Sequence, residues 1–466
     1  MPISPARAAA FEILLRVERT DAYASELLHA PRFNTLSSID HGLVTELVLG
    51  VLRWRGVLDE CIAQHVTKTV NKLDPEVLTA LRLGVYQLLF LDRVPTHSAV
   101  NESVELVKQA RKRSASGMVN AVLRKISGTA THRASQKTRD KGGPTASQLP
   151  HTAVKSAGEI GHPLRVEAAS PLSAHPAWLV ERWTKIYGRG PAEAICSYDQ
   201  SAPQTTIRIT EPGLIDELSR DGIALTPGNL LSKAFVVADG DITKTRASRE
   251  RRLIIQDEAS QLVALLVGSG NLLLDCCAAP GGKARILAEQ NPQSIVIGME
   301  LHPHRAALLK KLAHSENIRV IAADARSIPL APQFDRVLVD APCSGTGTLA
   351  RNPEIKWRLK PEDITRLQAY QLEILLSAMD RVANGGRLIY STCSLEPEEN
   401  SEVVQNALRT NSAFRVLECR DELAKLKHQG ELAVENLDSL LNGPHLRTVP
   451  GIHACDGFFA VILEKS

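Results

Sequence analysis

The sequence has no CxxC pair among its eight cysteines, and no apolar run of the roughly 18 residues that a membrane-spanning helix needs. Cys276 and Cys277 are adjacent and the other cysteines are irregularly spaced, which excludes a regular zinc or disulfide framework. The first residues lack the apolar core of a secretion signal. These absences predict a reducing, cytoplasmic location, with no membrane partner.

The chain also lacks a strong charge of either sign. Its 55 lysines and arginines nearly balance its 52 aspartates and glutamates, which leaves a net charge of +3. This balance neither indicates nor excludes a nucleic-acid partner, because local basic patches can bind phosphates on a nearly neutral protein. With 466 residues and 44% hydrophobic content, the chain is long enough for two to four domains, each with a core.

Residues 1–127 are predicted to form an all-α bundle of five to seven helices. Apolar residues such as Phe11, Leu14 and Leu15 recur at spacings of three and four, the period of an amphipathic helix. Each apolar stripe needs a facing partner, which favours a compact bundle. Several basic residues form either a solvated face or a surface for RNA. They are Lys108, Arg111, Lys112, Arg113, Arg124 and Lys125.

The next two segments differ from the bundle in composition. Residues 128–170 are rich in Ser, Thr, Gly, Pro, His and Lys and have no hydrophobic period, which predicts a flexible linker. Residues 171–250 are predicted to form a small α/β lobe with a short helix and two strands. Arginines near the end of this lobe either bind phosphates or are solvated. They are Arg246, Arg249, Arg251 and Arg252.

Residues 251–466 alternate strands and helices, which is typical of a Rossmann-like doubly wound α/β domain. The predicted strands are 272–276, 295–300, 319–324, 336–340 and 387–391. Ligands of such sheets bind at the carboxyl ends of the parallel strands. Four of these ends carry an acid, namely Asp275, Glu300, Asp324 and Asp340. This coincidence predicts a ligand site at that edge of the sheet.

A cofactor site is predicted where residues 275–283 (DCCAAPGGK) combine a strand end, a tight turn with two glycines and a helix start. Glycine lets the backbone approach a ligand closely, and a helix start points unpaired N–H groups at it. Glu300 follows Gly282 by nearly the ~20 residues at which such folds place a ribose-binding carboxylate. Asp324 is then available to an adenine amino group. Because the turn is not GxGxxG, S-adenosylmethionine is favoured over a nicotinamide cofactor.

Two cysteines, Cys343 and Cys393, lie beside neighbouring strand ends, so two thiols are expected to flank one pocket. An isolated buried cysteine is usually only a small hydrophobic residue, but this location favours chemistry. Methylation of carbon 5 of a pyrimidine requires a nucleophile at carbon 6, and a thiolate suits that role. A cation such as Lys283 is expected to promote the ionised thiol. Asp340 is placed to pair with N3 and the amino group of a cytosine.

These motifs resemble those of a known family. Residues 275–283 (DCCAAPGGK), 340–347 (DAPCSGTG) and 391–395 (STCSL) are similar to the signature motifs of RNA cytosine-5 methyltransferases that use S-adenosylmethionine. Residues 94–108 and 117–125 resemble the closing helices of NusB-type RNA-binding bundles. Outside residues 128–170, the chain is similar to the bacterial Sun/Fmu type.

The resemblance implies roles for individual residues. Cys393 would be the attacking nucleophile, Cys343 would assist release of the product, and Asp340 would act beside them. The cofactor-contacting positions would be Cys277, Ala278, Ala279, Pro280, Gly281, Gly282, Lys283, Glu300, Asp324 and Asp340. Residues 351–357 would lie near the substrate, which in this family is a cytosine in small-subunit ribosomal RNA. Two departures from the family pattern are Glu300, where aspartate is common, and Asn352, which replaces a basic residue.

Two alternatives remain at this stage. The same chemistry could act on transfer RNA or on another ribosomal RNA site. The chain could instead be an RNA-binding, antitermination-type factor with a dormant catalytic domain, against which the intact Cys343 and Cys393 argue. His302 and His304 have no third ligand nearby in the sequence, so no metal site is predicted.

Overall fold

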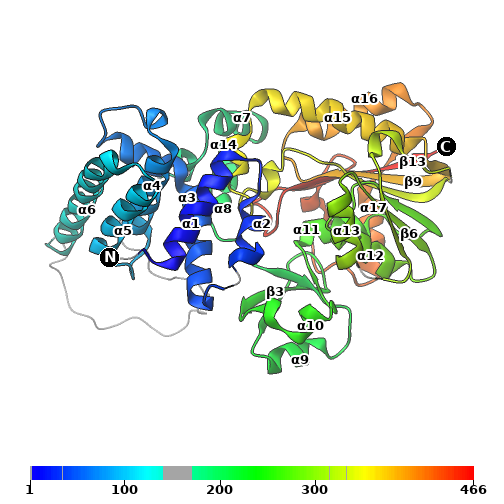
Figure 1. Cartoon of the computed structure of the whole chain (residues 1–466). Coiled ribbons are helices and arrows are strands. Elements are labelled where there is room, and N and C mark those ends of the chain that lie inside the picture. The colour runs from blue at the N-terminus through cyan, green and yellow to red at the C-terminus, as the bar shows by residue number, and fades with distance from the viewer. Residues whose placement is uncertain (1–2, 34, 140–169, 314, 332) are drawn as a thin grey trace, which may run out of the picture. The chain divides into compact units, whose positions relative to one another are not determined.

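The computed structural model describes residues 3–33, 35–139, 170–313, 315–331 and 333–466 (Figure 1). The side chains of residues 129–139 are excluded from the description. The chain forms two compact units. Unit 1 comprises Met1–Gln200 with Ala350–Trp357, and unit 2 comprises Ser201–Leu349 with Arg358–Ser466. The chain therefore leaves unit 2 after Leu349, contributes one short segment to unit 1, and returns at Arg358.

The predicted all-α bundle is confirmed in unit 1 (Figure 1). Buried apolar residues from all of its long helices share one core, in which Ile13, Leu47 and Leu81 are fully buried. Burial of this shared apolar face, more than helix propensity, stabilises such a bundle. Its helices are α1 (Pro5–Arg19), α2 (Ala24–Leu28), α3 (Ser38–Ala63), α4 (Pro75–Phe90), α5 (Thr96–Gln109) and α6 (Ser116–Arg139).

Two of the predicted segment boundaries differ from the structure. α6 continues past residue 127 to Arg139, because residues 128–139 contain no proline and only one glycine to end it. The rest of the predicted linker, 140–169, lies outside the described residues. Helices α7 (Ala177–Tyr187) and α8 (Arg189–Asp199), predicted to belong to the small lobe, have their contacts in unit 1. The fully buried Trp183 shows why α7 packs as part of a core.

The small lobe in unit 2 is an antiparallel sheet with the strand order β2-β3-β1-β4. Ile207 and Leu214 are fully buried in its separate core. The lobe is therefore an α/β structure, as predicted. Its elements are β1 (Thr206–Arg208), α9 (Leu214–Arg220), β2 (Ala224–Pro227), β3 (Ala234–Asp239), α10 (Arg246–Arg249) and β4 (Ile254–Ile255).

The rest of unit 2 contains a mixed sheet with the order β11-β12-β13-β9-β8-β5-β6-β7, and β10 pairs with β13. The segment from β9 to β7 is parallel and confirms the predicted Rossmann-like core, whereas β10 to β13 form an antiparallel half. The strands are β5 (Leu272–Asp275), β6 (Ile295–Glu300), β7 (Ile318–Ala322), β8 (Phe334–Asp340), β9 (Val382–Thr392), β10 (Phe414–Leu417), β11 (Leu441–Asn442), β12 (His445–Thr448) and β13 (Phe458–Lys465).

Helices cover both faces of this sheet (Figure 1). Side chains alternate between the faces along each strand, so Leu273 packs against α11, α12 and α17 while Leu274 packs on the side of α15 and α16. A sheet covered on both faces exposes its strand ends, which is where polar residues gather. The helices are α11 (Glu258–Leu265), α12 (Gly282–Gln290), α13 (Pro303–Leu312), α15 (Pro361–Met379), α16 (Ser401–Thr410) and α17 (Cys419–His428). The short helix α14 (Ile355–Arg358) lies almost wholly in the segment that belongs to unit 1. Among the described residues, no helix is long and apolar enough to cross a membrane.

Candidate active site

Four acids mark the carboxyl ends of four adjacent parallel strands. Asp340 ends β8, Asp275 ends β5, Glu300 ends β6, and Asp324 follows β7 by two residues. Neighbouring strands lie about 4.8 Å apart, so the sheet brings these side chains to one edge. The predicted clustering of acids at this edge therefore exists in the structure.

The turn between β5 and α12 requires glycine at two positions. Gly281 has φ +117°, and a Cβ there would lie 2.9 Å from both Ala313 and Leu309. A Cβ on Gly282 would lie 2.8 Å from the amide oxygen of Gln256. The turn is also attached to the next strand, because the backbone N–H of Ala278 donates to the carbonyl of Met299 at 2.8 Å. Residues 277–282 are therefore held tightly at the strand ends.

Lys283, in the first turn of α12, joins the turn to the end of β8. Its ammonium lies 2.7 Å from Asp340, donates to Ser260 at 2.7 Å, and stands 5.1 Å above the ring of Phe458. Burial alone would lower the pKa of Lys283, but Asp340 outweighs it and the pKa is raised, with Cys393 contributing. Lys283 is therefore held as a cation at this edge of the sheet.

The side chains of the two predicted cysteines lie next to each other. Cys393 follows β9 directly and Cys343 follows β8 after two residues, and their sulfur atoms are 3.3 Å apart. The hydrogen bond with Cys393, together with burial, raises the pKa of the Cys343 thiol. Asp340 also accepts a hydrogen bond from Ser391 at 2.8 Å. One site therefore holds a cation, a carboxylate and two thiols.

The remaining acids differ in how they are held. Glu300 is buried and accepts a hydrogen bond from the backbone N–H of His302 at 3.0 Å. Asp324 is ion-paired with Arg326 at 2.7 Å, and the hydrogen bond from Arg326 lowers its pKa. Neither oxygen of the buried Asp275 is within full hydrogen-bonding geometry of a donor, although the backbone N–H of Cys277 is near enough to favour its ionised form. Burial, reinforced by Asp340, raises its pKa to about 7.

This set of groups fits S-adenosylmethionine. The cofactor carries a sulfonium, an ammonium and a ribose diol, and carboxylates can bind each of these groups. The structure places the buried carboxylates of Asp275 and Glu300 at neighbouring strand ends, beside the tightly packed turn that contains Gly281 and Gly282. The unpartnered oxygens of Asp275 are the most direct sign of a polar ligand at this edge.

Sequence reasoning missed Glu399, which lies next to both thiol loops. Its fully buried carboxylate accepts hydrogen bonds from Ser344 and Ser394, the residues that follow the two cysteines. The repeated Cys-Ser pair was the only signal in the sequence, because Ser344 and Glu399 are 55 positions apart.

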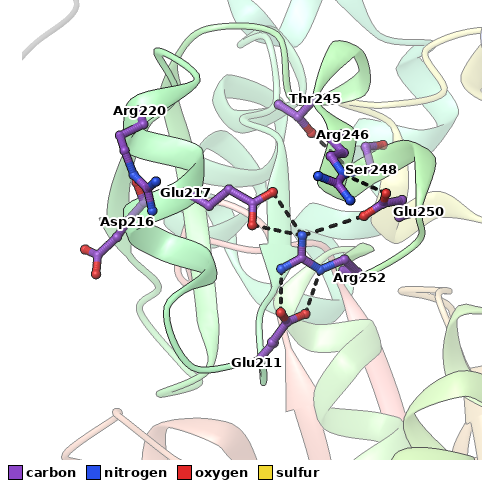
Figure 2. Close-up of polar contacts among 9 residues, drawn as sticks. All are labelled: Glu211, Asp216, Glu217, Arg220, Thr245, Arg246, Ser248, Glu250 and Arg252. Carbon is purple, nitrogen blue, oxygen red and sulfur yellow. Dashed lines mark hydrogen bonds and ion pairs between the residues drawn. The ribbon is translucent and has the colours of Figure 1, made fainter.

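Two of the four arginines at the end of the small lobe, Arg246 and Arg252, are paired with acids. Arg252 forms ion pairs with Glu211, Glu217 and Glu250, and Arg246 pairs with Glu250 (Figure 2). The sequence predicted that these side chains either bind phosphates or are solvated. In the structure both instead form ion pairs with acids of the lobe. Arg249 lies on the exposed surface of the same segment.

Residues 351–357, expected near the substrate, include side chains buried in unit 1. Glu354 accepts from the backbone N–H of Ala24 at 2.8 Å, and Lys356 donates to the carbonyl of Arg53 at 3.0 Å. Burial lowers the pKa of Lys356 to about 7. These two residues anchor the segment inside the helical unit rather than presenting charge to a ligand.

Comparisons with known proteins agree with this architecture. The model of the NusB family matches residues 4–128, a ferredoxin-like domain of RsmF/B-like methyltransferases matches 175–241, and the 16S rRNA methyltransferase RsmB/F model matches 262–464. The ferredoxin-like match includes α7 and α8, although the contacts of these helices lie in unit 1. Together, the fold and the site define an RNA-modifying methyltransferase with an N-terminal NusB-like domain.

Relatives along the whole chain identify the family. The probable ribosomal RNA small subunit methyltransferase B of Bacillus subtilis is 32% identical, covering 98% of this chain and 98% of its own. The ribosomal RNA small subunit methyltransferase B of Vibrio cholerae is 30% identical, with coverages of 98% and 97%. The crystal structure of PH0851 shares the fold with a TM-score of 0.75 at 23% identity, over 100% of both chains. The chain belongs to the 16S rRNA methyltransferase RsmB/F family and is an rRNA methyltransferase.

Proposed function

We propose that the chain transfers a methyl group from S-adenosylmethionine to carbon 5 of a cytosine in 16S rRNA, through a covalent bond between Cys393 and carbon 6. The observation that carries this proposal is the 3.3 Å approach of Cys343 and Cys393 beside the Lys283–Asp340 ion pair. Relatives over the full length are named as methyltransferases of small-subunit rRNA, which supports the choice of RNA. Work on ribosomal RNA would place the protein in the cytoplasm.

In this proposal Cys393 is the nucleophile. Lys283 stabilises its thiolate, which bonds to carbon 6 and makes carbon 5 electron-rich. When bound, S-adenosylmethionine supplies the electrophilic methyl group. Asp340 orients Lys283 and accepts a hydrogen bond from the base. The turn at residues 277–283, with Glu300 and Asp324, holds the cofactor.

Cys343 completes the cycle. Its pKa is raised by the hydrogen bond with Cys393, and that bond is lost once Cys393 is bonded to carbon. Cys343 can then release its own proton to solvent and, as a thiolate, take the proton from carbon 5. The bond between carbon 6 and the sulfur of Cys393 breaks, its electron pair returns to the sulfur, and the double bond of the ring is restored.

The experiment is transfer of a labelled methyl group to small-subunit rRNA by the wild type and by Cys393→Ala and Cys343→Ala. We expect Cys393→Ala to be inactive and Cys343→Ala to accumulate a covalent protein–RNA adduct visible on a denaturing gel. Normal activity of Cys393→Ala would rule out the assigned nucleophile. Parallel assays with naked 16S rRNA, assembled small subunits and tRNA decide the substrate, and a preference for tRNA would exclude the rRNA assignment.

A further inference from the structure

The residues that follow the two cysteines meet at one buried carboxylate. Ser344 and Ser394 place their hydroxyl oxygens 3.0 Å apart, and both donate to the same oxygen of Glu399, Ser394 at 2.5 Å. Glu399 ends a short 3-10 turn after β9 and is fully buried. One carboxylate therefore joins the loop of Cys343 to the loop of Cys393.

The second oxygen of Glu399 holds the Cys343 loop alone. It accepts from the backbone N–H of Ser344 at 2.8 Å and from the side-chain amide of Gln371 at 2.9 Å. The same amide nitrogen donates to the carbonyl of Pro342 at 2.9 Å. An ionised carboxylate accepts about four hydrogen bonds, so four donors saturate Glu399 and leave it little freedom to move.

Cys393 is also held from both sides by the residue after Glu399. The hydroxyl of Thr392, which precedes Cys393, donates to the side-chain oxygen of Asn400. The side-chain amide of Asn400 donates to the carbonyl of Ser394, which follows Cys393, at 2.9 Å. The Glu399–Asn400 pair therefore fixes the backbone on each side of the thiol that would react.

The charge of Glu399 acts on Cys343. It adds to the hydrogen bond with Cys393 and to burial in raising the pKa of Cys343. Burial raises the pKa of Glu399 itself, while its hydrogen bonds with Ser344, Ser394 and Gln371 favour the ionised form. An ionised carboxylate beside Cys343 therefore favours the protonated thiol.

We propose that Glu399 is a positioning residue of the two-thiol centre, which holds Cys343 and Cys393 at their reacting distance through Ser344 and Ser394. This inference rests on the proposed function, in which both thiols act on one base. Glu399 acts through its hydrogen bonds to the two loops. A buried carboxylate that accepts from four donors is held in one position by them, which a side chain that only fills space would not be.

The test compares Glu399→Gln with Glu402→Gln in the full-length chain. Glutamine keeps the size of the side chain but removes its charge and one acceptor. Glu402 is the control because it is exposed, and the hydrogen bond that the structure shows for its side chain comes from Gln368 on α15. Two properties are measured: the rate at which iodoacetamide alkylates each cysteine across pH, resolved by peptide mass spectrometry, and the kinetics of labelled methyl transfer.

For Glu399→Gln we expect the alkylation profile of Cys343 to shift to lower pH, because the nearby negative charge is gone. The kcat for methyl transfer should fall about tenfold or more, while KM for S-adenosylmethionine stays within about twofold. Glu402→Gln should match the wild type in both assays. A loss of packing alone would not move the profile of one thiol selectively.

Unchanged alkylation of Cys343 together with unchanged kcat in Glu399→Gln would overturn the proposal. If Glu399→Gln does not fold, Ser344→Ala and Ser394→Ala each remove one hydroxyl donor and leave the charge in place; they should fold and lower kcat, and wild-type kcat in both would equally overturn it. Alkylation requires no RNA or cofactor. A wild type inactive on every RNA would defeat the proposed function, while the alkylation profiles would still decide the role of Glu399.

Discussion

The ammonium of Lys283 and the carboxylate of Asp340 form an ion pair of 2.7 Å between the start of α12 and the end of β8. The pair lies at the edge of the sheet where Cys393 follows β9. Asp340 keeps the pKa of Lys283 high despite burial, which would otherwise lower it. The turn between β5 and α12 and the two-thiol site are thus linked through one charged contact.

Replacing Lys283 with methionine tests this link. Methionine has a similar length but no charge, so the thiolate of Cys393 loses its cation, and Asp340 is left without its partner. We expect methyl transfer to fall about 100-fold and the alkylation of Cys393 at pH 7 to slow. Lys310→Met, an exposed position on α13, is the control. Alkylation of Cys393 at the wild-type rate in Lys283→Met would separate Lys283 from the thiol.

The 3.3 Å separation of Cys343 and Cys393 predicts a disulfide under oxidising conditions. A disulfide bond is about 2.05 Å long, so a small movement of the loops suffices. Hydrogen peroxide should oxidise the two thiols to a disulfide, and their hydrogens leave in water. This oxidation should abolish methyl transfer, and a dithiol reductant should restore it. Mass spectrometry should find a Cys343–Cys393 cross-linked peptide. Cys343→Ser should show no such peptide and should still form the covalent adduct with RNA after peroxide treatment. A block of adduct formation that the reductant reverses would contradict the assignment.

The buried carboxyl of Asp275 predicts a pH-dependent stability. Its pKa is about 7 in the folded chain because of burial and then Asp340, against about 3.9 in an unfolded chain. Between these values the folded state binds more protons than the unfolded state, so this group makes the protein less stable as pH rises from about 4 to about 7. Denaturant titrations at pH 5 and pH 8 should show a smaller loss in Asp275→Asn. Asp380→Asn, exposed after α15, should retain the wild-type loss.

The parallel half of the sheet could be predicted from the sequence, because its strands are apolar runs and most of them end in or near an acid. β6, Ile295–Glu300, has the predicted bounds, and β5, Leu272–Asp275, ends one residue earlier than predicted. β10 (Phe414–Leu417) was not predicted, because it is short and ends in no acid. It exists because it pairs with β13, a strand distant in sequence.

Contacts distant in sequence also account for the missed part of the site. Glu399 has no motif of its own, and its role depends on the fold bringing Ser344 and Ser394 to it. The small lobe offers a second case. The partners of Arg252 are Glu211 and Glu217, which lie 41 and 35 positions earlier, so the arginines looked like a basic cluster in the sequence alone.

The small lobe provides a matched pair of variants for RNA binding. Arg252 is neutralised by Glu211 and Glu217, whereas Arg249 is exposed on α10 (Figure 2 shows the Arg252 contacts). A phosphate would have to compete with two carboxylates for Arg252 but with water for Arg249. We therefore expect Arg249→Ala to weaken binding of a 16S rRNA fragment and to reduce the salt dependence of log K by about one.

Arg252→Ala should instead lower the thermal unfolding temperature and leave two uncompensated carboxylates, Glu211 and Glu217, in the lobe. Fluorescence anisotropy at several salt concentrations measures affinity, and thermal melts measure stability. If Arg252→Ala were to reduce the salt slope while Arg249→Ala did not, the ion pairs would have to open on RNA binding. Equal slopes in both variants and the wild type would instead show that the small lobe is not part of the RNA-contacting surface, because the slope measures the number of phosphate contacts.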